Sequence, residues 1–387
     1  MNMKLNKNLK LIEESATLRL NALAKQIASG GTTVVNLTAG ELDFETPKEI
    51  AREVARYLHL NKYTPSLGML ELRRGIAESL NKKYGLKLGE RNIAVTAGAK
   101  QGLFLACQAL LNAGDEVIIP VPYWVSYAHQ VRLCGARPVF VALTKNFDLG
   151  VTAVKKAVTK KTKAIILNSP HNPTGAVFNP AKVKQLLSFA AKRGIFVIAD
   201  EIYGKLTYGK PFISVLKMKP DFSRLILVDG FSKSHALTGW RIGYAVADER
   251  IIASFNKILG HTAGNASVIS QRAALACLAH PEIPRRFAAI LKDRRALAVS
   301  LIKKIPGLRL VPPQGAFYLF LDVRKITKNS EQLAERLLAD AGLAVVPGEA
   351  FGEPGFLRIS FAASKSEIRR GLALLRRFIK KSGILRT

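Results

Sequence analysis

Seven short runs of consecutive apolar residues, separated by segments of helical pattern, constrain the fold of this 387-residue chain most strongly. Apolar residues at consecutive positions suit strands that helices cover on both faces. Between two runs, the apolar residues from Val183 to Ala191 recur at helical spacing and can cover a sheet with one stripe. The runs are residues 93–96, 117–121, 138–143, 164–167, 196–199, 225–228 and 244–246. We therefore predict an α/β fold with a mostly parallel, seven-stranded central sheet.

The pattern changes after about residue 285. A basic amphipathic helix is followed by strand-like runs at 308–311 and 315–323, a helix at 331–341, and strands at 343–346 and 357–361. A closing helix places Ile368, Leu372, Leu375 and Ile379 on one stripe. A chain of this length usually forms more than one domain, because a single hydrophobic core does not keep growing with chain length. We predict a large domain at 46–285, built on the seven-stranded sheet, and a smaller α+β domain at 286–387, which the N-terminal segment 1–45 joins.

The chain is strongly basic, with 59 Lys and Arg against 28 Asp and Glu and a formal net charge of +31. A basic surface attracts anions such as phosphates and carboxylates but does not identify a site. The excess is spread in short clusters along the chain, without a zinc-finger or aromatic-interleaved module. We expect solvated helix faces and no dedicated nucleic-acid partner.

Three cysteines, Cys107, Cys134 and Cys277, lie far apart without a C-x-x-C spacing, and their apolar or helical contexts suit buried free thiols. They indicate a reducing compartment. No apolar stretch approaches the roughly 18 residues of a membrane span, and the N-terminus lacks the apolar core of a signal peptide. We expect a cytoplasmic protein with no membrane partner and no metal.

Unusual polar residues follow the predicted strands, where ligands of open α/β sheets bind. A turn with Gly98, Ala99 and Lys100 follows residues 93–96 and opens a helix, whose free N–H groups suit a phosphate. By itself such a turn is more often structural. A rigid turn with two prolines and a glycine presents Asn172, which without other signals fits a plain turn equally well.

The next two strands end in groups that need partners. Asp200 and Tyr203 follow residues 196–199, and a carboxylate there is costly unless a cation or strong donor meets it. Lys233 follows residues 225–228, and poor solvation at such a position lowers a lysine pKa and makes the amine nucleophilic. Arg241 lies eight residues further on and offers a fork for a phosphate. Independent helix caps and surface charges do not explain this combination.

The order of these motifs resembles the fold type I, class I aminotransferases, in particular the bacterial aspartate aminotransferase subgroup Ib. The motifs are NPTG at 172–175, D-E-x-Y at 200–203, and S-K at 232–233 with Arg241 beyond. The resemblance covers nearly the whole chain, from Ser15 to the L-R-I-S run at 357–360. It implies pyridoxal 5'-phosphate as cofactor and a ping-pong exchange between an amino acid and a 2-oxo acid.

The resemblance implies a role for each residue at the cofactor ring. Lys233 matches the lysine that binds the cofactor as a Schiff base and moves the substrate proton. Asp200 matches the partner of the ring nitrogen, which lets the ring accept electrons. Asn172 and Tyr203 match the pair that bonds the ring 3-oxygen. Trp124 matches the aromatic residue that stacks on the ring, although without the motif it fits a core position equally well.

The cofactor phosphate would be held by N–H groups at Gly98 and Ala99 and by Arg241. Tyr63 matches a residue that reaches the phosphate from a second subunit, so the resemblance implies a homodimer with shared sites.

Two departures from the family pattern matter. Gly230 stands where many relatives carry a phosphate-binding hydroxyl, which puts one contact in doubt. Leu42 replaces a usual proline and loosens that turn.

The substrate contacts also follow from the resemblance. Arg358 matches the arginine that holds the α-carboxylate, and Gly40 the small residue that lets the N-terminal segment close over the substrate. Lys100 matches the lysine that takes the distal carboxylate in subgroup Ib, which favours aspartate or glutamate. The plain alternative for Lys100 is a solvated residue in the first helical turn. The same lysine occurs in relatives that act on prephenate.

Three other functions stay open on the sequence alone. A prephenate aminotransferase, an aromatic aminotransferase or one of broad specificity would share the residues above. A lyase or decarboxylase on the same fold would keep the cofactor and change the reaction. A regulatory or nucleic-acid-binding protein that retained the fold would fit the positive charge, but the complete set of cofactor residues argues against it.

Overall fold

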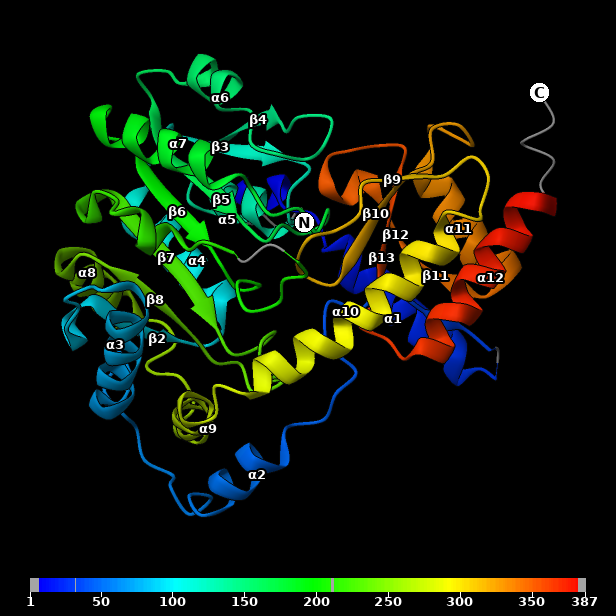
Figure 1. Ribbon diagram of the computed structural model, residues 1–387. Helices are drawn as coiled ribbons and strands as arrows, with labels where there is room; N and C mark the ends of the chain where they lie inside the picture. The colour runs from blue at the N-terminus through cyan, green and yellow to red at the C-terminus, as the bar shows by residue number, and fades with distance from the viewer. Residues whose placement is uncertain (1–6, 32, 210–211, 382–387) are drawn as a thin grey trace, which may run out of the picture.

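The computed structural model describes residues 7–31, 33–209 and 212–381, in which a large sheet and a small sheet lie at opposite ends of the molecule (Figure 1). All seven predicted runs are strands of the large sheet. They are β2 (Ile93–Thr96), β3 (Glu116–Val121), β4 (Arg137–Ala142), β5 (Thr162–Asn168), β6 (Phe196–Asp200), β7 (Leu225–Gly230) and β8 (Gly243–Ala247). Their order is β2-β8-β7-β6-β5-β3-β4, and β8 alone among these strands runs in the direction opposite to the other six. The predicted α/β fold is confirmed.

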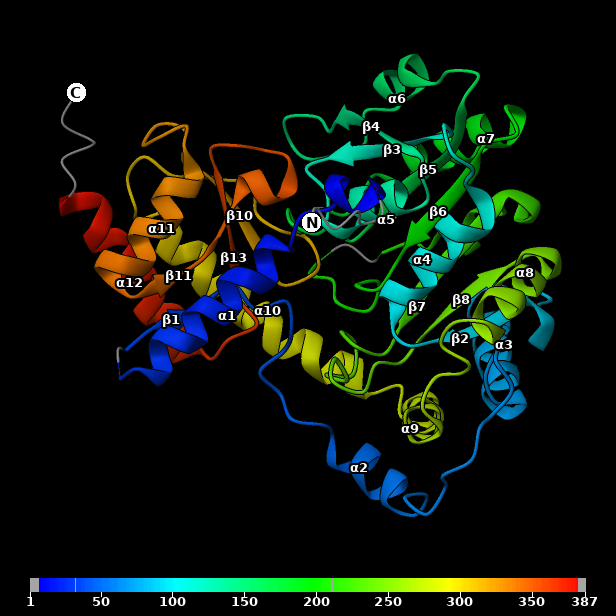
Figure 2. The same cartoon turned by 180° about the vertical axis from the view of Figure 1, so that it is seen from behind.

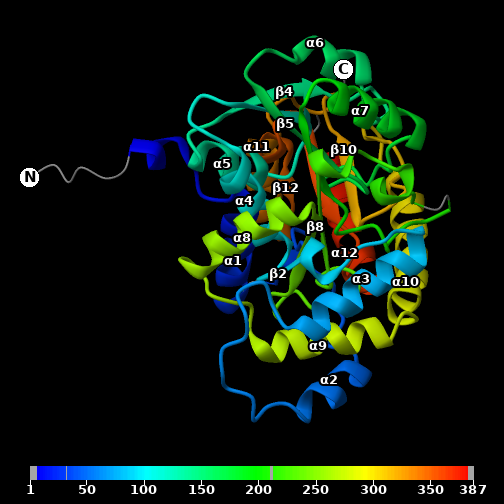
Figure 3. The same ribbon diagram turned by 90° about the vertical axis from the view of Figure 1, so that its left-hand side faces the viewer.

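Helices cover both faces of the large sheet, as the consecutive apolar runs require. Figure 3 shows α4 (Ala99–Leu110), α5 (Ser126–Leu133) and α8 (Glu249–Gly260) on one side of it, and α3 (Leu70–Tyr84) and α7 (Pro180–Lys192) on the other. Alternate residues of one strand enter different cores: Ile165 packs with the α7 side and Ile166 with the α4 side. Helix α6 (Val151–Ala157) lies beside α7 and β4.

The smaller part is built on a four-stranded antiparallel sheet in the order β12-β13-β10-β9. Its strands are β9 (Arg309–Leu310), β10 (Tyr318–Asp322), β12 (Val346–Pro347) and β13 (Phe356–Ser360), and α11 (Ser330–Ala341) and α12 (Lys365–Lys381) pack around them. The apolar stripe predicted for the closing helix is buried. The single strand predicted at 343–346 is wrong, because β11 (Leu343–Ala344) and β12 belong to different sheets.

The N-terminal segment pairs with the smaller part. Strand β1 (Val35–Asn36) runs parallel to β11, and α1 (Ala16–Ser29) lies against the same region (Figure 2). Helices α2 (Lys48–Ala55) and α9 (Val268–Ala279) lie side by side below the large sheet, and α10 (Ile283–Ile302) runs from there to the small sheet. The predicted domain boundaries stay a prediction.

The cysteines are free; Cys107 and Cys277 are buried as expected, whereas Cys134 is only half-buried. Among the described residues, no helix combines the length and apolarity needed to cross a membrane.

Candidate active site

A pocket of about 520 Å³ lies where the carboxyl ends of the large sheet's strands face the smaller part. Of the twelve residues that the sequence singles out as site residues, ten line this pocket. They are Gly40, Ala99, Lys100, Trp124, Asn172, Asp200, Tyr203, Lys233, Arg241 and Arg358. Gly98 borders it through Arg241, whereas Tyr63 is 96% exposed and is not among the lining residues.

Lys233 follows β7 and points its amine at the segment that closes the pocket. Its Nζ donates a hydrogen bond to the Gly40 carbonyl at 2.7 Å. The pKa of Lys233 is lowered to about 8, chiefly by removal from water. Glu41 and Asp200 oppose this shift, whereas Arg241 and Arg358 add to it. About a fifth of the amine is therefore neutral near pH 7.4, far more than for a free lysine, and the neutral form is the one that acts as a nucleophile or base.

Asp200 is the last residue of β6 and meets two donors rather than a cation. The Tyr127 hydroxyl donates to Oδ2 at 2.7 Å and the Ile202 N–H donates to Oδ1 at 3.1 Å. Burial raises the pKa of Asp200 to about 6, although the hydrogen bond from Tyr127 acts in the opposite direction. The two hydrogen bonds fix the carboxylate in position, but they do not offset the cost of burying its negative charge. A positively charged group in the pocket would therefore be stabilised beside it.

Arg358 lies on β13 of the small sheet and lines the pocket from that side. It is 2% exposed; Nη1 donates to Oδ1 of Asn172 at 3.1 Å and Nη2 donates to the Thr38 carbonyl at 2.7 Å. Its Nε has no hydrogen-bond partner among the described residues. A buried guanidinium with an unused donor and no carboxylate partner is a ready site for a carboxylate.

Tyr318 on β10 is a pocket residue that the sequence reasoning missed. Its hydroxyl lies 2.9 Å from that of Tyr203, and its ring lies 4.3 Å from the Arg358 guanidinium. A Cβ at Gly40 would lie 3.3 Å from the same hydroxyl, so a small residue there lets the closing segment approach. Tyr318 fell inside a strand-like run, and nothing in that apolar pattern marked its hydroxyl as part of the site.

The start of α4 forms a cradle with Arg241. Gly98 has a φ of +81°, which L side chains rarely adopt, and a Cβ there would lie 2.8 Å from Nη2 of Arg241. Arg241 Nη1 donates to the Thr238 carbonyl at 2.9 Å, which holds the guanidinium near the helix N-terminus. At Gly230 a Cβ would lie 2.9 Å from the Gly243 Cα, so the adjacent backbone of β8 explains why no larger residue stands there.

Lys100 and Trp124 lie together on the wall beside Asp200. The Lys100 Nζ is 5.1 Å from the centre of the Trp124 ring, and that ring packs edge-on against Tyr127. Partial burial lowers the pKa of Lys100, and Arg241 adds to this effect. Helix α1 and the residue before it also line the pocket, with side chains that the sequence reasoning did not identify: Ser15, Thr17, Leu18 and Asn21.

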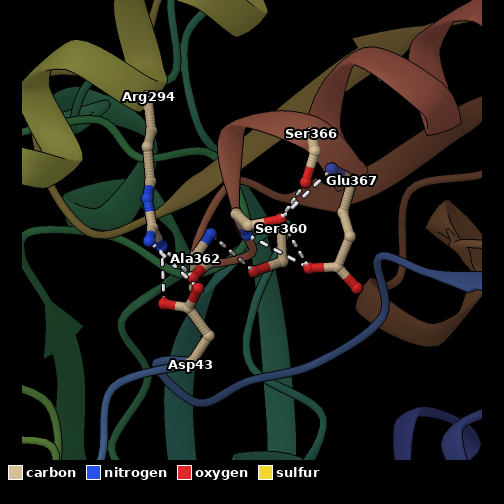
Figure 4. A network of polar contacts seen from close by, with 7 residues as sticks. Asp43, Arg294, Ser360, Ala362, Ser366 and Glu367 are labelled. Atoms are coloured by element: carbon tan, nitrogen blue, oxygen red, sulfur yellow. Dashed lines mark hydrogen bonds and ion pairs between the residues drawn. The ribbon is translucent and has the colours of Figure 1, made fainter.

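The closing segment, residues 37–44, is tied down at its far end by the ion pair of Figure 4. Arg294 on α10 donates to both carboxylate oxygens of Asp43, at 2.6 and 3.0 Å, and also to the Ala362 carbonyl just beyond β13. Its guanidinium also lies 4.9 Å from the Phe44 ring. This buried arginine joins the closing segment, α10 and the strand that carries Arg358.

Comparisons with known proteins agree with this geometry. Residues 32–375 match the family model for aminotransferase class I and II. The aspartate aminotransferase of Thermotoga maritima is 40% identical over 94% of this chain and 96% of the relative. The aspartate/prephenate aminotransferase of Thermus thermophilus is 36% identical over 98% of this chain and 99% of the relative.

Solved structures give the same result. The Thermotoga maritima aspartate aminotransferase superposes with a TM-score of 0.93 at 39% identity, over 97% of this chain and 100% of the other. The Thermus thermophilus aspartate aminotransferase with maleate has a TM-score of 0.93 at 36% identity, with the same coverage. The predicted resemblance and the fold type I architecture are both confirmed.

Proposed function

Because the chain belongs to the family of class I and II aminotransferases, we propose that it moves the amino group of aspartate or glutamate to a 2-oxo acid, with pyridoxal 5'-phosphate as cofactor. The single observation that carries the proposal is the meeting of Lys233, Asp200 and Arg358 in one pocket. They supply a partly neutral amine, a fixed carboxylate and an unpaired buried guanidinium.

The residues present fit the cofactor. The cradle of Gly98, the N-terminus of α4 and Arg241 suits a phosphate, since backbone N–H groups and a guanidinium converge there. Asp200 would hold a proton on the ring nitrogen, which its under-compensated charge favours. Asn172 and Tyr203 would bond the ring oxygen, and Trp124 would cover the ring face. Bound pyridoxal phosphate would supply an aldehyde that takes up the amino group and a ring that accepts electrons released at the substrate Cα.

Each remaining step belongs to the chain's own residues. Arg358 would hold the substrate α-carboxylate through its guanidinium fork, supported by Thr38 and Asn172. Lys233, freed from the Gly40 carbonyl, would take the α-proton on Nζ and return it, because an amine with a pKa of about 8 both gains and loses a proton near neutral pH. The closing segment would exclude water over these groups.

Lys100 supports the choice of a dicarboxylic substrate. It is a cation on the pocket wall, separated from Arg358, so the two could hold the two ends of one dicarboxylate. The Thermus thermophilus relative was solved with maleate, which is a dicarboxylate. Prephenate also carries two carboxylates, and three of the relatives are probable or known aspartate/prephenate aminotransferases.

The proposal includes a homodimer. Tyr63 is fully exposed on one chain and does not reach that chain's own pocket, which fits a role in the site of a second copy. A Tyr63→Phe variant that loses affinity for the cofactor phosphate in the dimer, while keeping its fold, would support this assignment.

The test is a half-reaction with each candidate amino acid, followed by the absorbance of the bound cofactor. We expect a rapid spectral change with aspartate and glutamate, a weak one with alanine and phenylalanine, and ping-pong kinetics with a 2-oxo acid. A Lys233→Ala variant should lose the visible band. With enzyme first reacted with glutamate, a faster return of the absorbance with prephenate than with 2-oxoglutarate would identify prephenate as the preferred amino acceptor. Release of ammonia or carbon dioxide without an acceptor would identify a lyase or decarboxylase instead.

A further inference from the structure

Helix α12 presents a basic face to solvent. Of its 17 residues, seven are Lys or Arg and one is Glu, while its apolar stripe packs inward. Arg369, Ala373, Arg376 and Lys380 are exposed and follow one another at intervals of four, three and four residues. Side chains at this spacing share one face of a helix, so these residues form a straight stripe about 16 Å long.

The stripe borders a groove of about 440 Å³ between α12 and the end of α10, which lie side by side in Figure 1. Leu301, Leu372 and Ala373 contribute apolar surface to this groove. Lys304 stands on the α10 side, opposite the arginines of α12. The groove therefore has an apolar floor and a positively charged rim on both sides.

The rim charges have no acidic partners within residues 7–31, 33–209 and 212–381. The ion pairs of this region hold Lys365, at the start of α12, and Arg336 on α11, and none includes Arg369, Arg376 or Lys380. The helix dipole favours cations in the last turn, which accounts for Lys380. It does not account for Arg369, near the other end, and Arg376 and Lys380 repel each other at an i,i+4 spacing.

We propose that this groove binds an acidic amphipathic helix of a partner protein. An apolar stripe on such a helix would cover Leu301, Leu372 and Ala373, and flanking carboxylates would meet the rim on both sides. Three turns of a helix match the length of the stripe. A nucleic acid fits less well, because none of the described residues that line the groove is aromatic and an apolar floor offers nothing to a phosphate backbone.

The test measures fluorescence anisotropy of a labelled 16-residue helical peptide, with Leu on one face and Glu elsewhere, against the cofactor-loaded protein at 0.15 M salt. The double variant Arg369→Glu/Arg376→Glu should weaken binding at least ~10-fold, because two attractive contacts become repulsive. Lys184→Glu/Lys192→Glu is the matched control, since it makes the same change in net charge on exposed residues of α7 and should leave binding within about twofold.

A third variant tests the contribution of the apolar floor apart from that of the charged rim. Leu301→Gln keeps every charge but puts a neutral polar side chain on the apolar floor, so it should weaken peptide binding if the floor is buried. Tighter binding by this variant, equal losses in both charge-reversed proteins, or equal affinity for a scrambled peptide of the same composition would overturn the proposal. So would tighter binding of a single-stranded oligonucleotide. Unchanged transamination in all variants would show that they fold.

Discussion

The ion pair between Arg294 and Asp43 should behave as one coupled unit. Removing one partner of a buried pair leaves the other charge uncompensated and costs about 3–5 kcal/mol. Asp43→Ala leaves a guanidinium that is only 9% exposed with the Ala362 carbonyl as its remaining acceptor, so we expect about 3 kcal/mol. Arg294→Met leaves Asp43, which is 31% exposed and can rehydrate, but it also orphans the Ala362 carbonyl, and we expect about 3 kcal/mol here too.

The double variant Asp43→Ala/Arg294→Met removes both charges, and Met fills much of the arginine's volume. It should therefore cost about 3 kcal/mol rather than the sum of about 6, a coupling energy of about 3 kcal/mol. A chain with two large parts need not unfold in one step. The free energy to measure is therefore that of the local opening in which the closing segment separates from its neighbours. Hydrogen exchange of the Leu37 and Ser360 amides reports it, because both join the closing segment to its neighbours.

A surface pair provides the control. Arg336 and Asp340 on α11 lie 3.5 Å apart with both side chains more than half exposed, so Arg336→Ala should change the same opening free energy by less than about 0.5 kcal/mol. Additive effects of the two Arg294 and Asp43 changes, to within about 0.5 kcal/mol, would refute the coupling and mean that the contacts of Figure 4 contribute independently.

Three further predictions concern the pocket. Lys100→Met should lower kcat/KM for aspartate by ~10- to 100-fold, the loss of one hydrogen bond to a charged group, and leave alanine unchanged in steady-state assays. In the cofactor-free protein the pKa of Asp200 rises from 3.8 to about 6, so the native state binds the proton more tightly and stability falls as pH rises through this window. Asp200→Asn should therefore be more stable than the wild type by about 3 kcal/mol at pH 8, an advantage that shrinks below pH 6 in thermal unfolding. With a pKa of about 8 for Lys233, the rate of cofactor uptake, followed by stopped-flow absorbance, should rise about tenfold per pH unit below pH 8 and level off above it; a flat profile would contradict the neutral-amine requirement.

The sequence predicted the large sheet well because burial on both faces leaves a direct signal in consecutive apolar residues. It also predicted which groups would meet, since residues at the carboxyl ends of parallel strands gather at one edge. Asp200 ends β6, and Lys233 follows the neighbouring strand β7. The motif resemblance added Arg358, which lies on another sheet and carries no local signal of its role.

Contacts that depend on tertiary packing escaped the sequence reasoning. Tyr127 sits in a helix of mixed polarity and Tyr318 in a largely apolar strand, and only the folded chain brings their hydroxyls to Asp200 and Tyr203. The run at 343–346 is continuous in sequence, yet the chain changes sheets within it, with Leu343 pairing with Val35 and Val346 with Arg358. A residue pattern of period two does not encode which neighbour a strand will choose.

The closing segment contacts two of the basic side chains of the site, and this yields a last prediction. The Thr38 carbonyl accepts from Arg358 and the Gly40 carbonyl accepts from Lys233, so one short stretch of backbone contacts a cation from each part of the molecule. If Arg294 holds that stretch through Asp43, then Asp43→Ala should raise KM for aspartate and alanine alike, because the α-carboxylate site is common to both. Lys100→Met should raise it for aspartate alone. An Asp43 variant that discriminated between the two amino acids would place Asp43 in substrate recognition instead, and the closing segment would then have to be held by its other contacts.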